Sequence, residues 1–455
     1  MSLRKQQLLL SLAIPLVLVL TACSAGGQNP APGPEPEPEP GVTTLIYAQI
    51  SEDGVDREWL DKFNSDHEGE IQIAVRDYSQ MSEGGQQGID LLITEIASGK
   101  IPDIIELGTS GETTEFSYRK LAEGGYLEDL WPYIENDPSL GRAKVIEAPL
   151  KASEINGGLY VAFDSFWLHT MLGSKSVVGD RIGWTVEDLL EAFDTMPEGS
   201  VIVETFRDYS MREHLLASFL YGFSDLFIDW EDGRCFFDNE TFRSILDLVK
   251  RVPDKAAWHE YYPEESDRYA EYRHRQMDGV AMLSDLGLTS PRIMQQNDFF
   301  FDGVTCIGYP VGDGSTGAYI EPTGIKLAMS STCKDKEAAW QYIRRTFLPR
   351  SSSYPFIAAP INTQTYRRLK AEDLRFNGGV MLGSEVIRFG EPVTKEQYEY
   401  VEALFDTPRS SILLDKNVRD IVLEVAGAYF AGDRDLDQTV QMLNSRVSLY
   451  LNEQR

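Results

Sequence analysis

Apolar and polar positions along the chain follow two periods, which predict strands and helices in turn. Short apolar runs at residues 44–50, 71–75 and 103–107 have the length and pattern of buried strands. Between them, apolar residues recur at helical spacing over residues 55–63 and 89–97. The order strand, helix, strand, helix, strand is typical of a parallel α/β sheet.

The same rhythm continues toward the C-terminus. Further strands are predicted at residues 158–163, 201–204, 279–283, 304–309 and 324–329, with a β-hairpin over 227–237. Capping residues mark two helix starts, Thr185 with Asp188 after it, and Asp335 before a helix with one apolar face. Two amphipathic helices, over residues 417–430 and after Asp435, complete the chain.

The N-terminus follows neither period. A basic start precedes an apolar run over residues 8–20 that Pro15 interrupts. The run is shorter than the roughly 20 apolar residues of a membrane span, so a signal peptide over residues 1–22 is favoured over a transmembrane anchor. The sequence Leu20-Thr21-Ala22-Cys23 resembles the bacterial lipoprotein box, which implies that Cys23 is lipidated. Residues 23–42, rich in Pro and Glu, are then an extended linker.

Charge and motifs exclude several functions. The chain has 42 Lys and Arg against 72 Asp and Glu, a net charge of -30, which argues against nucleic acid or an anionic lipid surface as partner. The five His form no zinc motif, and no P-loop or nucleophile-elbow sequence occurs. We therefore expect no metal, no cofactor and no catalytic residue.

The glycine motif at 312–317 and the three cysteines of the body give weaker signals. Gly312-x-Gly314-x-x-Gly317 fits the dinucleotide fingerprint, but Pro322 follows where that fingerprint needs a helix, so a loop is expected. Cys235, Cys306 and Cys333 have long, irregular spacings. A disulfide between two of them and free buried thiols both fit, and the spacing favours free thiols.

A series of motifs then occurs in a fixed order over the body of the chain. They are the helix-Gly-x-x-Pro-Asp-Ile pattern at 94–105, Tyr126-Leu127-Glu128-Asp129-Leu130, Gly157-Gly158-Leu159-Tyr160, Gly308-Tyr309-Pro310, the Glu-Ala-Ala-Trp helix at 334–343, and the ending at 446–453. This series resembles the extracellular solute-binding proteins of bacterial ABC importers, family 1, the carbohydrate-binding type. The resemblance implies an α/β, two-lobed periplasmic-binding-protein-like (type II) fold, with hinge crossovers and a ligand cleft between lobes. It assigns residues 43–161 plus 312–365 to lobe 1 and 162–311 plus 366–455 to lobe 2.

The resemblance also implies a function. The protein would be a receptor rather than an enzyme, capturing a sugar or oligosaccharide and delivering it to ABC permease subunits that work with a separate ATPase. With its lipid, it would be a monomer held at the extracellular face of the cytoplasmic membrane of a Gram-positive bacterium. Two alternatives stay open, a receptor for a peptide or polyamine, and an extracellular carbohydrate-active enzyme with a carboxylate on each side of a glycosidic bond.

Strand ends supply the candidate ligand contacts, because open α/β sheets bind ligands beyond the carboxyl ends of strands and at domain interfaces. The candidates are Ser51, Tyr78, Thr109, Asp164, Ser165, Trp167, Arg207, Ser210, Ser284, Asp285, Tyr319 and Glu321. Aromatic rings suit the apolar faces of sugars, and carboxylates and hydroxyls suit their hydroxyl groups. Tyr78 and Trp167 fit a core equally well, and Ser51 could instead cap a helix. Asp164 and Asp285 lie beside apolar residues and need a partner.

Overall fold

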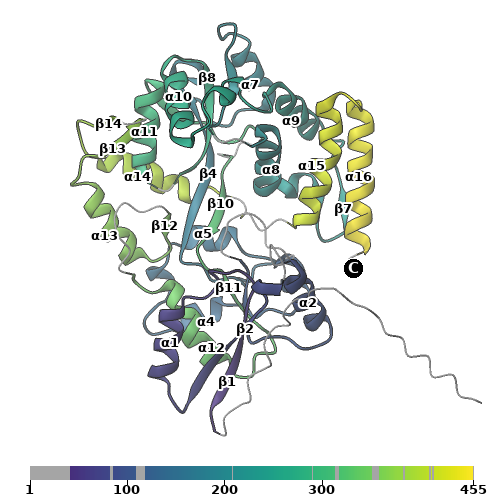
Figure 1. Ribbon diagram of the computed structural model, residues 1–455, viewed down its shortest axis with the longest axis vertical. Helices are drawn as coiled ribbons and strands as arrows, with labels where there is room; N and C mark the ends of the chain where they lie inside the picture. Colours follow the sequence, from purple (N-terminus) through teal and green to yellow (C-terminus); the bar gives the residue numbers. More distant parts are fainter. Residues whose placement is uncertain are drawn as a thin grey trace, which may run out of the picture.

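The computed structural model describes residues 41–81, 86–108, 118–206, 209–288, 290–312, 317–350, 358–382, 385–408, 411 and 415–453. The predicted signal peptide, Cys23 and most of the linker lie outside these residues. The described chain forms two α/β lobes, one below the other in Figure 1, each built around its own sheet. In the described part, no helix has both the length and the apolar character needed to cross a membrane.

The first lobe is built around a four-stranded sheet in the order β11-β3-β1-β2. Its strands are β1 (Thr43–Gln49), β2 (Ile71–Asp77), β3 (Ile104–Glu106) and β11 (Leu327–Met329). Its helices are α1 (Arg57–Asp66), α2 (Gln86–Ala97), α3 (Tyr118–Glu123), α4 (Trp131–Asn136), α5 (Glu147–Ala152) and α12 (Lys336–Ile343). β1 pairs in parallel with β2 and β3, as the alternation of strand and helix predicts, and only β11 is antiparallel.

The second lobe has a six-stranded sheet whose path is β10-β4-β8-β5, with β9 and β12 also paired to β4. Its strands are β4 (Ser165–Ser174), β5 (Val201–Val203), β8 (Ala281–Leu288), β9 (Val304–Cys306), β10 (Tyr319–Thr323) and β12 (Ala359–Pro360). Its helices are α6 (Lys175–Val178), α7 (Val186–Phe193), α8 (Met211–Phe223), α9 (Glu240–Arg251), α10 (Glu265–Met277) and α11 (Pro291–Phe301). Only β5 and β8 pair in parallel here, so a parallel sheet is not the rule for this lobe.

Strands β4 and β10 form the two crossovers between the lobes and pair antiparallel, from Tyr319 opposite His169 to Thr323 opposite Ser165. Figure 1 shows them running side by side through the centre of the molecule. The strand predicted at 158–163 is wrong. This segment forms isolated β-bridges and hydrogen bonds to side chains in place of a strand. For example, the N–H of Leu159 donates to Asp129 Oδ1 at 3.0 Å.

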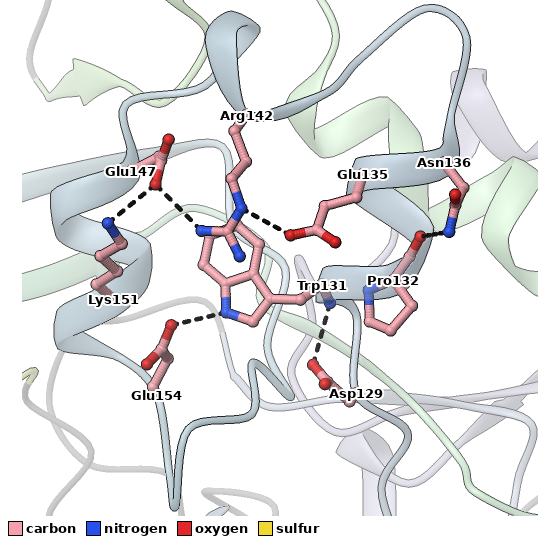
Figure 2. Close-up of polar contacts among 9 residues, drawn as sticks. All are labelled: Asp129, Trp131, Pro132, Glu135, Asn136, Arg142, Glu147, Lys151 and Glu154. Atoms are coloured by element: carbon pink, nitrogen blue, oxygen red, sulfur yellow. Dashed lines mark hydrogen bonds and ion pairs between the residues drawn. The ribbon is translucent and has the colours of Figure 1, made fainter.

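A polar cluster on the first lobe holds the chain that leads to the first crossover (Figure 2). The guanidinium of Arg142 lies 4.1 Å from the ring centroid of Trp131. Its Nε is 2.7 Å from Glu135 and its Nη1 is 3.1 Å from Glu147. The indole N–H of Trp131 donates to Glu154 at 2.7 Å. The cluster thus joins α4 and α5 through one buried indole ring.

Helical capping follows the local sequence signals. Thr185 and Asp188 form the predicted capping box of α7, and Asp335 accepts the N–H of Ala338 at the start of α12. The hairpin predicted over 227–237 is present as β6 (Ile228–Asp229) and β7 (Arg234–Cys235). All three cysteines of the body are free thiols, and burial raises the pKa of Cys306 to about 11.

The last part of the chain returns to both lobes. Residues 363–405, which we call the strap, comprise α13 (Thr363–Asp373), β13 (Gly379–Leu382), β14 (Glu385–Arg388) and α14 (Lys395–Phe405). Strap side chains such as Tyr366 and Phe405 belong to an apolar cluster that contains the core of the first lobe and also Phe166 of β4. The predicted final helices, α15 (Lys416–Ala431) and α16 (Leu436–Glu453), pack in the second core. The lobe limits drawn from the sequence, with a boundary after residue 365, stay a prediction.

Candidate functional site

A cavity of about 400 Å³ lies at the carboxyl ends of β5 and β8, beside the crossover strand β4. It is lined by Trp167, Val203, Glu204, Thr205, Phe206, Tyr209, Met211, His214, Leu215, Tyr272, Arg273, Ser284, Asp285, Gly287, Ile293, Gln296 and Asn297. All of these described lining residues come from the second lobe. The position agrees with the general preference of ligands for strand carboxyl ends in α/β sheets.

Aromatic rings form much of the wall. Trp167 comes from β4, Phe206 and Tyr209 from the segment between β5 and α8, and Tyr272 from α10. Gly287 of β8 makes room for the indole, because a Cβ there would lie 3.1 Å from the ring of Trp167. The wall therefore offers flat apolar faces, the surface on which rings of a solute stack.

The carboxylate of Asp285 has three polar partners around the cavity. Its Oδ1 accepts the hydroxyl of Tyr309 at 2.6 Å, and its Oδ2 lies 3.2 Å from His214 Nε2 and 3.4 Å from Ser218 Oγ. Burial alone would raise the pKa of Asp285, but the hydrogen bond and charge of His214 and the bond from Tyr309 outweigh it and lower the pKa. The carboxylate is thus ionised and oriented in the cavity.

The second carboxylate, Glu204, is engaged with the protein. Arg275 Nε donates to it at 2.8 Å and Trp258 Nε1 at 3.0 Å. Its side chain is only 1% exposed. Arg273, also in the lining, donates from Nη1 to Asn297 Oδ1 at 3.0 Å. The polar groups of the lining are therefore oriented by neighbours before any solute arrives.

A chain of ionisable side chains follows the crossovers from one sheet to the other. Glu321 of β10 bonds His169 of β4, and the imidazole stacks on Tyr319 with centroids 4.8 Å apart. Burial lowers the pKa of Lys326 to about 8, although Glu321 and Glu106 raise it. Burial raises the pKa of Glu106, at the end of β3, even though it accepts the N–H of Ile50 and Ser51. The region between the two sheets therefore contains ionisable side chains that are buried.

Of the predicted ligand contacts, Trp167, Ser284 and Asp285 line the cavity together. Four others lie on or next to the crossovers with partners of their own: Asp164 with Arg350, Ser165 with Thr323, Tyr319 with His169, and Glu321 with His169.

The remaining candidates lie elsewhere. Ser51 bonds Glu106, Tyr78 is buried in the first core with its hydroxyl on Glu95, and Ser210 caps α8. Thr109 and Arg207 lie outside the described residues. All of these contacts stay predictions, because a ligand contact requires a ligand.

Most of the lining carries no local sequence signal. Tyr272 and Arg273 lie in the middle of α10, and Gln296 and Asn297 in the middle of α11. Their helices reach the cavity only through the packing of the lobe. His214 lies on α8, one turn after the predicted contact Ser210. Its position close to a predicted contact is a signal that could have identified it. Within the described part, no group of His, Cys, Asp and Glu could hold a metal ion.

Comparison with known proteins gives the fold. No protein-family model and no curated protein sequence matches the chain. Among solved structures, the sugar-binding protein MalE from Xanthomonas citri matches with a TM-score of 0.55 at 14% identity, over 90% of this chain and 98% of that one. An extracellular solute-binding protein family 1 from Alicyclobacillus acidocaldarius matches at 0.51 and 14%, over 91% and 100%.

The chain has the fold of the extracellular solute-binding proteins. The type II fold implied by the sequence motifs is therefore confirmed. A de novo designed cysteine esterase matches with a TM-score of 0.52 at 14% identity, over 91% of this chain and 100% of that one. Because the same fold occurs in a designed esterase, fold alone does not decide between binding and catalysis.

Proposed function

We propose that this protein is the solute receptor of a bacterial ABC importer and that it binds a sugar or oligosaccharide in the cavity beside β4. The observation that carries this proposal is the cavity itself, with its aromatic wall and an oriented, ionised Asp285 at the strand ends. Rings suit the apolar faces of a sugar and the carboxylate suits its hydroxyl groups. Closure of the first lobe over the solute, delivery to a permease with a separate ATPase, and lipid anchoring through Cys23 belong to the same proposal.

The state of the two cavity carboxylates favours a sugar over a polyamine. A polyamine needs carboxylates that can pair with its ammonium groups. Asp285 is already bonded to Tyr309 and His214, and Glu204 to Arg275 and Trp258. A sugar hydroxyl needs only one remaining acceptor site of a carboxylate and does not need its charge to be unpaired.

The same state argues against a glycoside hydrolase. Such an enzyme needs one carboxylic acid with a raised pKa and a second carboxylate, on the two sides of the bond to be cut. The pKa of Asp285 is lowered, in spite of burial, by His214 and Tyr309, and Glu204 is held by Arg275. We therefore propose binding without catalysis.

A ligand screen by thermal shift, followed by calorimetry, tests the proposal. The panel contains linear and branched oligosaccharides, short peptides and polyamines. A ligand at 100 times its dissociation constant stabilises the protein by about 2.7 kcal/mol. We expect a shift with at least one carbohydrate and its loss in Trp167→Ala. Shifts confined to peptides or polyamines would refute the sugar assignment, and turnover of a glycan by the purified protein would refute the binding-only assignment.

A further inference from the structure

Helix α11 lies between the cavity and the strap. Ile293, Gln296 and Asn297 of this helix line the cavity. The adjoining position, Arg292, pairs with Asp373 at the end of α13 in the strap. A contact that fixes this side of α11 therefore also fixes the cavity wall that the same helix provides.

The contact is a buried ion pair with directional bonds. Arg292 Nε donates to Asp373 Oδ1 at 2.8 Å, and Nη2 bonds the same oxygen and, at 3.1 Å, the carbonyl of Phe376. The side chains of Arg292 and Asp373 are 10% and 2% exposed. The hydroxyl of Tyr398 in α14 donates to Asp373 Oδ2 at 2.7 Å. Arg292 thus binds the strap at two points, Asp373 Oδ1 and the carbonyl of Phe376, while Tyr398 holds the other carboxylate oxygen from within the strap.

The strap is shaped to admit the guanidinium. A Cβ at Gly378 would lie 2.0 Å from Arg292 Nη1, so any larger residue at that position would displace the arginine. An apolar cluster of Phe300 of α11 with Val380 and Phe389 of the strap lies nearby, and the ring of Phe299 packs beside Phe389 with centroids 5.9 Å apart. The ion pair therefore adds directional bonds to an interface that is also apolar.

The two ends of the strap contact the first lobe and a crossover. Asn362, which caps α13, donates from Nδ2 to the carbonyl of Phe347 at 2.8 Å. The ring of Phe405 in α14 packs edge-on against Phe166 of β4, with centroids 5.0 Å apart. The strap thus connects the first lobe to a helix that walls the cavity in the second (Figure 1, left).

We propose that Arg292 and Asp373 are positioning residues of the ligand cavity: through them the strap holds α11 where Ile293, Gln296 and Asn297 form the wall. The role of the cavity in this inference rests on the proposed function, but the positioning of α11 does not. The strap then couples the place of the first lobe to the shape of a cavity that the second lobe lines.

Hydrogen exchange measured on the full chain without ligand tests the positioning. Arg292→Lys keeps the charge but loses the planar fork, and Asp373→Asn keeps the shape but loses the charge. In both, we expect amides of α11 to exchange about tenfold faster or more, while α1 and α9 stay unchanged. Arg142→Lys is the matched control, because Arg142 also stacks on an aromatic ring and pairs with two carboxylates, yet on the first lobe (Figure 2).

A second variant separates positioning from stability. Replacing the pair by Arg292→Met with Asp373→Leu, in a Tyr398→Phe background so that no buried hydroxyl loses its acceptor, removes both charges together, which often leaves global stability near its original value. We expect a nearly unchanged unfolding midpoint with α11 still exchanging faster. Wild-type exchange of α11 in this combined variant and in Arg292→Lys would overturn the inference.

The two proposals fail in different ways. If α11 keeps its wild-type exchange in the variants while maltotriose, cellotriose or xylotriose still shifts the midpoint of the wild type, only the positioning role is refuted. If α11 loosens as expected while none of these sugars binds the wild type, only the sugar assignment is refuted.

Discussion

Asp285→Asn is the most direct test of how the cavity is built. The substitution keeps the shape of the side chain and removes its charge. In the wild type the carboxylate has two well-placed partners, the Tyr309 hydroxyl at 2.6 Å and His214 Nε2 at 3.2 Å. Asparagine still accepts the Tyr309 bond through its oxygen, but both contacts lose their charge assistance.

The expected cost follows from these two contacts. A hydrogen bond to a charged group contributes about 1.5–3 kcal/mol and a neutral bond about 1 kcal/mol, so each contact loses about 1 kcal/mol. We therefore expect Asp285→Asn to lower the free energy of unfolding by about 2 kcal/mol at pH 7. Because the folded pKa of Asp285 lies below its ordinary value, this stabilisation is present above the unfolded pKa and is lost as pH falls through the folded pKa.

The assay is urea unfolding followed by tryptophan fluorescence, at pH 7 and at steps down to pH 3. The control is Asp437→Asn, because Asp437 is 74% exposed and pairs with Arg243 at the surface. We expect the control to change stability by less than about 0.5 kcal/mol. A difference between wild type and Asp285→Asn that is absent at pH 7, or that does not shrink in acid, would refute the reasoning.

Three further predictions use other features. Gly287→Ala should cost about 1 kcal/mol, because its Cβ would lie 3.1 Å from the Trp167 ring and this contact outweighs the gain from replacing a glycine. In a double-mutant cycle with Trp167→Ala, most of this cost should disappear without the indole, and additive effects would contradict the prediction. The pKa of Lys326 is lowered to about 8 in the folded protein, so the unfolded state binds more protons above that pH. The free energy of unfolding should therefore rise by about 2–3 kcal/mol between pH 8 and 10, and Lys326→Met should remove this rise. An unchanged pH dependence in Lys326→Met would contradict the lowered pKa. Cys23→Ala should release the protein from the membrane fraction while ligand binding by the body is kept, and a variant that stays membrane-bound would disprove the lipid tether.

Local signals in the sequence predicted most elements of the first lobe. The alternation of β1, α1, β2, α2 and β3 was readable because each element buries one face or both against the same sheet. The capping box of Thr185 and Asp188 was readable because it involves only residues within one turn. Such signals depend only on neighbouring residues and not on the tertiary packing of the chain.

The crossovers were harder to predict. Pro322 argued against a helix after residue 317, and a loop was expected there. Residues 319–323 instead form β10, which ends the strand path of its sheet, a place where a missing N–H is tolerated. β4 alternates buried and partly exposed positions only over its first half, and every residue from Thr170 to Ser174 is buried, so the alternation of a half-exposed strand is lost there. Its partners β8, β9 and β10 lie more than a hundred residues away in sequence, and no local pattern announces them.

The candidate site was predictable only where strands carry it. Trp167, Ser284 and Asp285 were found because they lie on or near strands that reach the cavity. Arg273 and Gln296 were missed because a helix interior gives no hint of what the helix packs beside. Tyr78 shows the converse, since an aromatic residue after a strand fits core and cavity alike, and its ring is buried in the first core.

The one-sided lining of the cavity has a kinetic consequence. All of its described lining residues come from the second lobe, so a solute can dock before the first lobe moves. Docking on a preformed surface proceeds at the encounter rate, which varies little among related solutes. Under the proposed function, lobe closure would then act on escape rather than on capture, and residence time would rank the solutes that the protein retains.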